Sequence, residues 1–238
     1  MKLILENKIT AVSADSEDAI YVADWVIEEE PKQKWKSTSG TGTLTLTVSS
    51  GDTLALASHN ADSISVTVKT MGDAIIQGPV VYDLSAWAFD KTYLWHEYPA
   101  QAEPYKITVA FSNCRSTPAY CGVAFAGPRL ELGNPSRQVQ TTYNSHQIEH
   151  NMSAGNKRVL DKSQKRSYRF SIKAKYIAGF LFADIQLARD VIKKCPIPIL
   201  LFDEDIGVPR IIYGNLHVHK STTYMYLRNT IDIEVTER

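Results

Sequence analysis

Histidine pairs at short spacing are the first residues of this chain that could do chemistry. His217 and His219 would share one face of a strand, a spacing that some metal sites use. No nearby Cys, Asp or Glu completes that pair. His146 and His150 would share a face on a helix, but their surroundings are not helical in pattern and lack the Glu of a H-E-x-x-H site. We therefore predict no metal site and no cofactor.

Sequence signatures of catalysis are missing. The chain has no G-x-S-x-G elbow, no glycine-rich phosphate loop and no Cys beside a convincing partner. The glycine-rich stretch Ser37–Thr43 leads into a predicted strand, so it lacks the helix N-terminus that holds a phosphate. We predict that the protein is not an enzyme. A pair of catalytic carboxylates in loops is the alternative that stays open.

Aromatic residues gather between positions 71 and 104 and form a candidate binding surface. The members that could contact a glycan or a partner are Trp87, Phe89, Tyr93, Trp95 and Tyr98. Exposed aromatic rings line many ligand sites, and sugars stack on them. The alternative is that these rings fill a sandwich core or a protein interface, because aromatic side chains bury large areas.

The sequence His59-Asn60-Ala61-Asp62 interrupts two apolar alternating runs. Asn and Asp suit turns because their side chains bond the local backbone. We therefore interpret this sequence as the turn between two strands, with His59 hydrogen-bonded at the sandwich edge and not holding a ligand. Replacing Asn60 by Ala is expected to lower stability more than binding.

Period-two alternation predicts the elements that must position these residues. Leu44, Leu46 and Val48 alternate with threonines, as in a half-buried strand. Further strands are predicted over 53–58, 63–69, 105–111 and 120–132, and 71–104 reads as long loops with one or two strands. Several short, closely spaced strands are typical of a sandwich or barrel.

The second half of the chain has a different organisation. Asn134-Pro135 breaks any strand, and apolar residues are sparse over 134–164, so we predict an extended connecting segment or arm there. Residues 165–238 are predicted to form a small β domain. It carries a helix over 178–194, where apolar residues form one stripe and Pro196 follows. The predicted fold class is mainly β, a jelly-roll β-sandwich followed by this domain.

Composition limits the possible partners. The 238 residues contain 26 Lys+Arg and 26 Asp+Glu, so no net charge directs the chain to nucleic acid. The basic stretch 156–175 alternates with a predicted buried strand face, which favours a solvated or partner-facing strand over a nucleic-acid site. No apolar run is long enough to span a membrane, so no membrane insertion is expected. The first ten residues hold too short an apolar run for a secretory signal, so we expect synthesis in a cytoplasm.

Three cysteines match neither a zinc spacing nor a C-x-x-C redox motif. Cys114, Cys121 and Cys195 are predicted to be free, mostly buried thiols. A disulfide between Cys114 and Cys121 across a turn stays open as an alternative.

The first half resembles a discoidin-like, galactose-binding-type jelly roll. The likeness is carried by the stretch from Ala23 to Thr70, with Trp35 before a loop and a strand that ends in a His-Asn turn. "YKITVAFSNCRSTPAYCGVAFAGPRLELG" resembles the closing strands of that fold. The resemblance covers residues 1–133 and implies a β-sandwich domain over that range.

The order of segments after residue 133 is similar to that of structural proteins in tailed-bacteriophage virions. In these, a jelly-roll module is joined to a small β domain, although distal-tail proteins place the β domain first. The resemblance implies a non-enzymatic virion component at the tail or tail tip, made in the host cytoplasm. It would assemble as a ring homo-oligomer with other tail proteins through edge strands. The alternative is a carbohydrate-binding module that recognises a host surface glycan.

Overall fold

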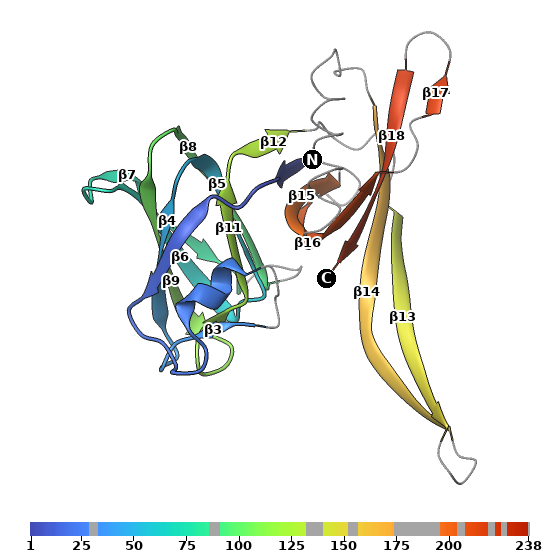
Figure 1. Ribbon diagram of the computed structural model, residues 1–238, viewed down its shortest axis with the longest axis horizontal. Helices are drawn as coiled ribbons and strands as arrows, with labels where there is room; N and C mark the ends of the chain where they lie inside the picture. The colour runs from blue at the N-terminus through green and yellow to red at the C-terminus, as the bar shows by residue number, and fades with distance from the viewer. Residues whose placement is uncertain are drawn as a thin grey trace. The chain divides into compact units, whose positions relative to one another are not determined.

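The computed structural model describes residues 1–28, 33–85, 91–131, 140–151, 157–173, 196–203, 208–218, 222–224 and 228–237. The chain divides into two compact units, and each is described by itself. The first contains Met1–Glu131, Ile197–Leu201 and Pro209–Ile212, and the second contains Leu132–Pro196, Phe202–Val208 and Tyr213–Arg238. Strands dominate the described residues, so the predicted mainly β class is confirmed (Figure 1).

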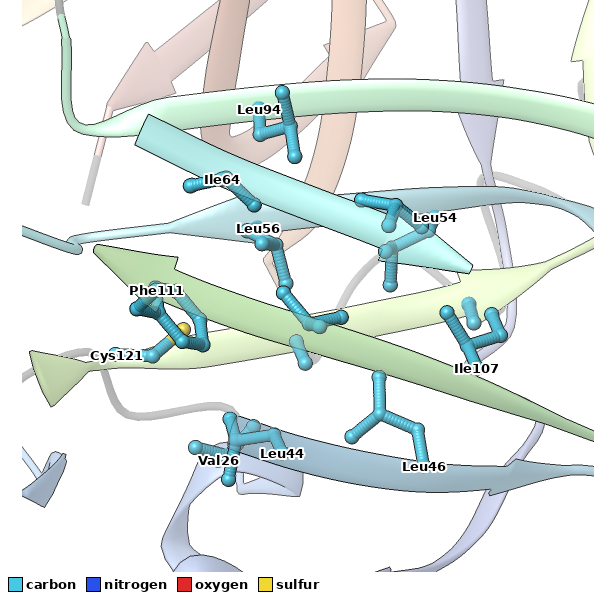
Figure 2. Close-up of a cluster of buried hydrophobic side chains, with 14 of the residues drawn as sticks. Val26, Leu44, Leu46, Leu54, Leu56, Ile64, Leu94, Ile107, Phe111 and Cys121 are labelled. Carbon is cyan, nitrogen blue, oxygen red and sulfur yellow. The ribbon is translucent and has the colours of Figure 1, made fainter. Parts of the chain in front are cut away.

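The first unit is built on two antiparallel sheets. The larger has five strands, in the order β2 (Ile9–Ala14), β4 (Gly42–Val48), β9 (Tyr105–Cys114), β6 (Ala61–Thr70) and β7 (Ile75–Asp83). The smaller has three, in the order β11 (Val123–Gly127), β5 (Gly51–Ala57) and β8 (Tyr93–Gln101). Figure 2 shows side chains of both sheets, among them Leu46, Leu56 and Ile107, in one shared hydrophobic core.

Shorter elements complete this unit. A 3-10 helix, η1 (Ala23–Ile27), precedes β3 (Trp35–Lys36), which pairs with β10 (Tyr120–Cys121). β1 (Lys2–Ile4) pairs on one side with β12 (Arg129–Glu131) and on the other with β15 (Ile197–Asp203). The N-terminal strand of the chain is thus held between two strands that follow it by more than a hundred residues.

Alternation in the sequence predicts the burial of two strands correctly. Leu44, Leu46 and Val48 of β4 are completely buried, and the apolar residues of β6 behave in the same way. β5 differs, because Ala55 and Ala57 on its second face are buried as well. β5 is the central strand of its sheet, and a strand covered on both faces reads as a nearly continuous apolar run.

The second unit contains a long antiparallel hairpin of β13 (Gln140–Asn151) and β14 (Lys157–Lys173). The end of β14 pairs with β18 (Arg228–Glu237), which also pairs with β16 (Val208–Val218) and β17 (Thr222–Tyr224). The boundary predicted between residues 164 and 165 falls inside β14. Backbone pairing does not require an apolar sequence, so sparse apolar residues did not reveal β13, whereas the alternation within 156–175 predicted a strand in β14. The helix predicted over 178–194 lies outside the described residues.

Candidate functional site

The predicted aromatic contact residues are buried where the structure describes them. Trp87 and Phe89 lie outside the described residues. Tyr93, Trp95 and Tyr98 all lie on β8, and none exposes more than 9% of its surface. Their burial leaves little ring face for a stacked sugar, and their contact with a glycan or partner stays a prediction.

Tyr98 points into the sandwich core and serves packing. Its hydroxyl donates a hydrogen bond to the Thr53 carbonyl at 3.3 Å and is also hydrogen-bonded to the Tyr105 hydroxyl. Burial raises the pKa of both phenols, that of Tyr105 to about 12. Both therefore stay protonated at neutral pH and act as hydrogen-bonding core residues.

Tyr93 and Trp95 pack on the opposite side of the same sheet. Tyr93 lies beside Ala57 and Trp95 beside Ala55, in register across β5 and β8. Ala55 lies in turn beside Phe125 of β11. Two large rings thus flank a small residue across the three strands of the sheet. The indole Nε1 of Trp95 donates to Glu97 at 3.0 Å, which connects this packed face to a group of charges.

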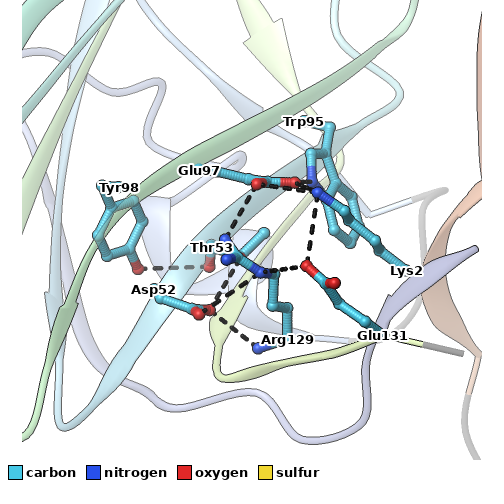
Figure 3. Close-up of polar contacts among 8 residues, drawn as sticks. All are labelled: Lys2, Asp52, Thr53, Trp95, Glu97, Tyr98, Arg129 and Glu131. Atoms are coloured by element: carbon cyan, nitrogen blue, oxygen red, sulfur yellow. Dashed lines mark hydrogen bonds and ion pairs between the residues drawn. The ribbon is translucent and has the colours of Figure 1, made fainter. Parts of the chain in front are cut away.

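We call that group the Glu97 cluster, and its charged members are Lys2, Asp52, Glu97, Arg129 and Glu131 (Figure 3). Lys2 Nζ lies 2.8 Å from Glu97 Oε1, and an Arg129 guanidinium nitrogen lies 3.0 Å from Glu97 Oε2. Arg129 also lies 3.0 Å from Glu131, and its backbone N–H donates to Asp52 at 2.9 Å. The cluster joins β1, β5, β8 and β12.

Electrostatics of the Glu97 cluster favour a structural role. Burial alone would raise the pKa of Glu97, but hydrogen bonds from Lys2 and Trp95 and the charges of Lys2 and Arg129 outweigh it and lower the pKa. The carboxylate is therefore ionised at neutral pH and cannot serve as a proton donor. Both cations already lie against carboxylates of the cluster. The arrangement ties four strands together and offers no acid–base pair for catalysis.

The His59-Asn60 sequence forms the turn predicted for it, between the end of β5 and the start of β6. The Asn60 side chain donates to the carbonyls of Ser116 and Pro118, at 2.7 and 2.9 Å, and accepts the Tyr120 N–H at 2.9 Å. His59 is completely buried, with its ring 6.4 Å from that of Phe111. These residues therefore hold two loops together at one end of the sandwich.

A surface that the sequence analysis did not identify lies around η1. Its members are half-buried aromatic and basic side chains, Tyr21, Trp25, Lys34, Lys36 and Tyr120, and we call it the η1 patch. Lys36 Nζ lies 3.5 Å from the centre of the Tyr21 ring, and Lys34 Nζ lies 4.2 Å from that of Tyr120. The Trp25 ring stands edge-on to Tyr21, with centroids 5.7 Å apart. Aromatic rings and ammonium groups thus alternate across the patch.

Backbone pairing explains why these side chains share a face. Lys36 is the register partner of Tyr120, and on its other side its N–H donates to the Tyr21 carbonyl at 3.1 Å. Lys34 stands two residues before Lys36, so both point to the same side of the strand. Trp35 between them points inward and is completely buried. A Cβ at Gly42 would lie 2.7 Å from the Trp35 ring, so glycine there lets this indole anchor β3.

The lysines of the η1 patch sit in a partly desolvated environment. Burial lowers the pKa of Lys34, and the nearby charge of Lys36 lowers it further, although Cys121 acts in the opposite direction. Within the part of the chain that the structure describes, neither Lys34 nor Lys36 forms an ion pair. The stretch Glu28–Lys36 balances its charges in the sequence and reads as a plain surface loop, so only tertiary pairing reveals the patch.

The backbone positions of three of the four paired histidines are described. His146 and His150 lie on β13, where four residues span about 13 Å. His217 lies on β16, and His219 is outside the described residues. Over those residues no three His, Cys, Asp or Glu side chains gather closely enough to hold a metal ion. Nor does any helix among them have the length and apolar character to cross a membrane.

The described cysteines are free thiols. Cys114 is half-buried and Cys121 is completely buried, and they do not form a disulfide. Burial raises the pKa of Cys121 to about 12, so this thiol is inert at neutral pH. Cys195 lies outside the described residues.

Comparisons with known proteins found similar solved structures but no matching family. No protein-family model and no curated protein matches the chain. CpGH89CBM32-5 from Clostridium perfringens, solved with GalNAc-β-1,3-galactose, is similar over 49% of this chain and 94% of its own, at 9% identity and a TM-score of 0.40. A pectin-binding carbohydrate-binding module is similar over 51% and 91%, at 14% identity and a TM-score of 0.40.

XRCC1, solved with the catalytic domain of DNA polymerase β, is similar over 52% of this chain and 99% of its own, at 12% identity and a TM-score of 0.39. Two of these proteins were solved with a saccharide or named for binding one, and the third was solved with a protein. None of the three is named as a bacteriophage tail protein. At these TM-scores the likeness carries no argument about what this chain binds.

Proposed function

We propose that the first unit is a non-catalytic module that binds a carbohydrate through the η1 patch. The observation that supports this most directly is the half-buried position of Trp25 beside Tyr21, with two ammonium groups on the same surface. Sugar rings present C–H faces that pack on aromatic rings, while their hydroxyls accept hydrogen bonds from Lys and indole N–H groups. The patch offers both kinds of contact within one surface.

Preorganisation of the patch supports the same proposal. β3 is hydrogen-bonded on both sides, to β10 and to the segment before η1, and Trp35 anchors it from below. The indole N–H of Trp35 donates to the Ser16 carbonyl at 3.2 Å. Binding groups that are already fixed lose little conformational entropy on association. This helps the patch to bind ligands that make few strong contacts, such as sugars.

Glycan-array binding of the purified protein tests the proposal. We expect the wild type to bind at least one glycan, Trp25→Ala to lose that binding, and Met71→Ala to keep it. Met71 is a suitable control because it is exposed and lies on the turn between β6 and β7. Circular dichroism must show that both variants are folded. A wild type that binds no glycan, or a Trp25→Ala variant that binds normally, would contradict the proposal.

A second candidate function is self-assembly in a virion tail, favoured by the edge strand β7. In the described part of the chain β7 pairs with β6 alone, and it exposes Ile75 and Val81, each by 64%. Exposed apolar edge strands can pair with a neighbouring copy. Under this proposal the protein is made in the host cytoplasm and forms a ring with other tail proteins in the virion.

Light scattering and negative-stain imaging test this second candidate. We expect a closed ring for the wild type and a smaller species for Ile75→Lys, because a charge on the edge disfavours pairing. Ala11→Lys, at an exposed position of the opposite edge strand β2, is the control for adding a charge to an edge. A wild type that stays monomeric at all concentrations would remove self-assembly from consideration.

A further inference from the structure

We infer that the glycan bound by the η1 patch is anionic, carrying a carboxylate or sulfate that Lys34 and Lys36 hold together. The inference rests on the proposed function, because it names the ligand class of the same surface. It is carried by the arrangement of the two ammonium groups, one from β3 and one from the residue just before it, which both contact aromatic rings.

The first step concerns the charges around the lysines. Two acids on the segment that leads into η1 are engaged by backbone N–H groups. Glu17 accepts the N–H of Ala23 at 2.9 Å, and Asp18 accepts that of Ile20 at 2.9 Å. In the described residues these carboxylates therefore stabilise the entry to η1 and do not form ion pairs with the lysines. The patch keeps two positive charges on a chain whose net charge is zero.

The second step concerns desolvation. The ammonium group of Lys34 is partly desolvated and faces the Tyr120 ring. The positive charge of Lys36 further disfavours the charged form of Lys34. An anion placed between two like charges removes their repulsion and replaces lost hydration by an ionic hydrogen bond. A neutral sugar cannot supply this compensation. An acidic ligand is therefore favoured over a neutral one, because only the acidic ligand relieves the repulsion between the two lysines.

The third step divides the contacts among the residues. The Tyr21 and Tyr120 faces are occupied by ammonium groups, which cation–π attraction holds there. The ring that remains for a sugar is Trp25, which stands at 87° to Tyr21. Trp25 then contacts the sugar ring, and Lys34 with Lys36 contact its acidic group. Loss of Trp25 and loss of the lysines should consequently have different effects.

A glycan array with matched pairs tests this inference on the full chain. The array carries uronic-acid, sialylated and sulfated glycans beside their neutral counterparts, and a single-stranded oligonucleotide as a non-sugar polyanion. The variant is the double replacement Lys34→Met and Lys36→Met, which removes the charges and keeps apolar stems against the rings. The matched control is Lys69→Met, on β6 of the five-stranded sheet.

We expect the wild type to prefer an acidic glycan over its neutral counterpart by about tenfold, a preference that two exposed ion pairs can supply. The double variant should bind both members of the pair equally, while Lys69→Met keeps the preference. The preference should weaken in high salt. Trp25→Ala should lose binding to both members.

The possible failures are distinguishable. Equal wild-type binding of acidic and neutral glycans would overturn the anionic ligand and leave the proposed function standing. Binding of no glycan at all would overturn both. Equally strong binding of the oligonucleotide would overturn the assignment to a glycan, because charge alone would then explain the interaction. An unchanged preference in the double variant would remove Lys34 and Lys36 from the site.

Discussion

Asn60 is a single residue on which one end of the sandwich depends. Its buried carboxamide bonds to Ser116, Pro118 and Tyr120, so Asn60→Ala leaves three backbone groups of the segment 116–120 without this partner. Buried groups that lose a partner cost about 1 to 3 kcal/mol in total stability. We expect the free energy of unfolding in urea to fall by that amount and glycan binding to change less, because Asn60 contacts the η1 patch only through the backbone N–H of Tyr120. The exposed Thr38→Ala is the control, and lost binding at intact stability would overturn this assignment.

His96 couples stability to pH. It is almost completely buried on β8, and Tyr82 shares a hydrogen bond of 2.7 Å with its Nδ1. Burial lowers the pKa of His96 from 6.5 to about 4, although the charge of Glu97 acts in the opposite direction. Between these two pH values the unfolded chain binds more protons than the folded one. Burial of neutral His96 therefore does not reduce stability above about pH 6.5. As the pH falls toward 4, the free energy of unfolding decreases by up to about 3 kcal/mol.

Urea unfolding at pH 7, 5.5 and 4.5 measures this dependence. Wild-type stability should decrease at each step, and His96→Gln should decrease less, because glutamine does not titrate. The control variant is Gln77→Ala on β7, which leaves the titration of His96 intact. Parallel pH profiles for the wild type and His96→Gln would show that other groups cause the acid sensitivity.

At the scale of the element, the Glu97 cluster fixes the short strands β1 and β12 to the sandwich. Glu97→Gln weakens its contacts with both Lys2 and Arg129, so we expect a loss of about 1 to 2 kcal/mol in unfolding free energy. Glu131→Gln is the matched control, since Glu131 is more exposed and should cost less. High salt should reduce the difference between Glu97→Gln and the wild type. Equal effects of the two variants would mean that Glu97 is not the centre of the cluster.

Strands with one buried face were predictable, and elements defined by pairing were not. β4 and β6 carry a strict alternation, because one of their faces is buried and the other is not. β13 carries no such pattern, and the alternation within 156–175 predicts a strand in β14 but not its partner, so the pairing of 140–151 with 157–173 was not predicted. The η1 patch is hidden for a similar reason. Tyr21, Lys36 and Tyr120 are distant in sequence and meet only because β3 is paired on both sides.

The aromatic stretch shows that composition does not predict exposure. Its rings were predicted as a candidate contact surface, which stays a prediction, while Tyr93 and Trp95 are buried on one face of β8 and Tyr98 on the other. Composition can locate aromatic residues, but exposure depends on what packs against each face. The half-buried Trp25 carries no signal in the sequence that separates it from the buried Trp95.

At the scale of the whole molecule, the first unit is discontinuous in sequence. β15 contributes Ile197, Ile199 and Leu201 to it, and all three are buried. Leu3 of β1 is the register partner of Leu130 in β12 and of Ile199 in β15, so β1 lies between two strands that are about seventy residues apart in the sequence. A fragment that ends at residue 131 therefore keeps the two main sheets and loses one partner of its first strand.

We expect fragment 1–131 to fold with a β-type circular dichroism spectrum but to be less stable than the same unit in the full chain. Exposure of Leu3 and Ile4, both buried in the full chain, costs about 1.5 to 3 kcal/mol for each side chain that becomes fully exposed. Because β1 lies at the margin of the sandwich, its residues should lose hydrogen-exchange protection first, while those of β4, β6 and β9 stay protected. The comparison is made by urea unfolding and amide exchange. Equal protection of β1 in the fragment and the full chain would mean that β12 and the Glu97 cluster suffice to hold the N-terminus, without any contribution from β15.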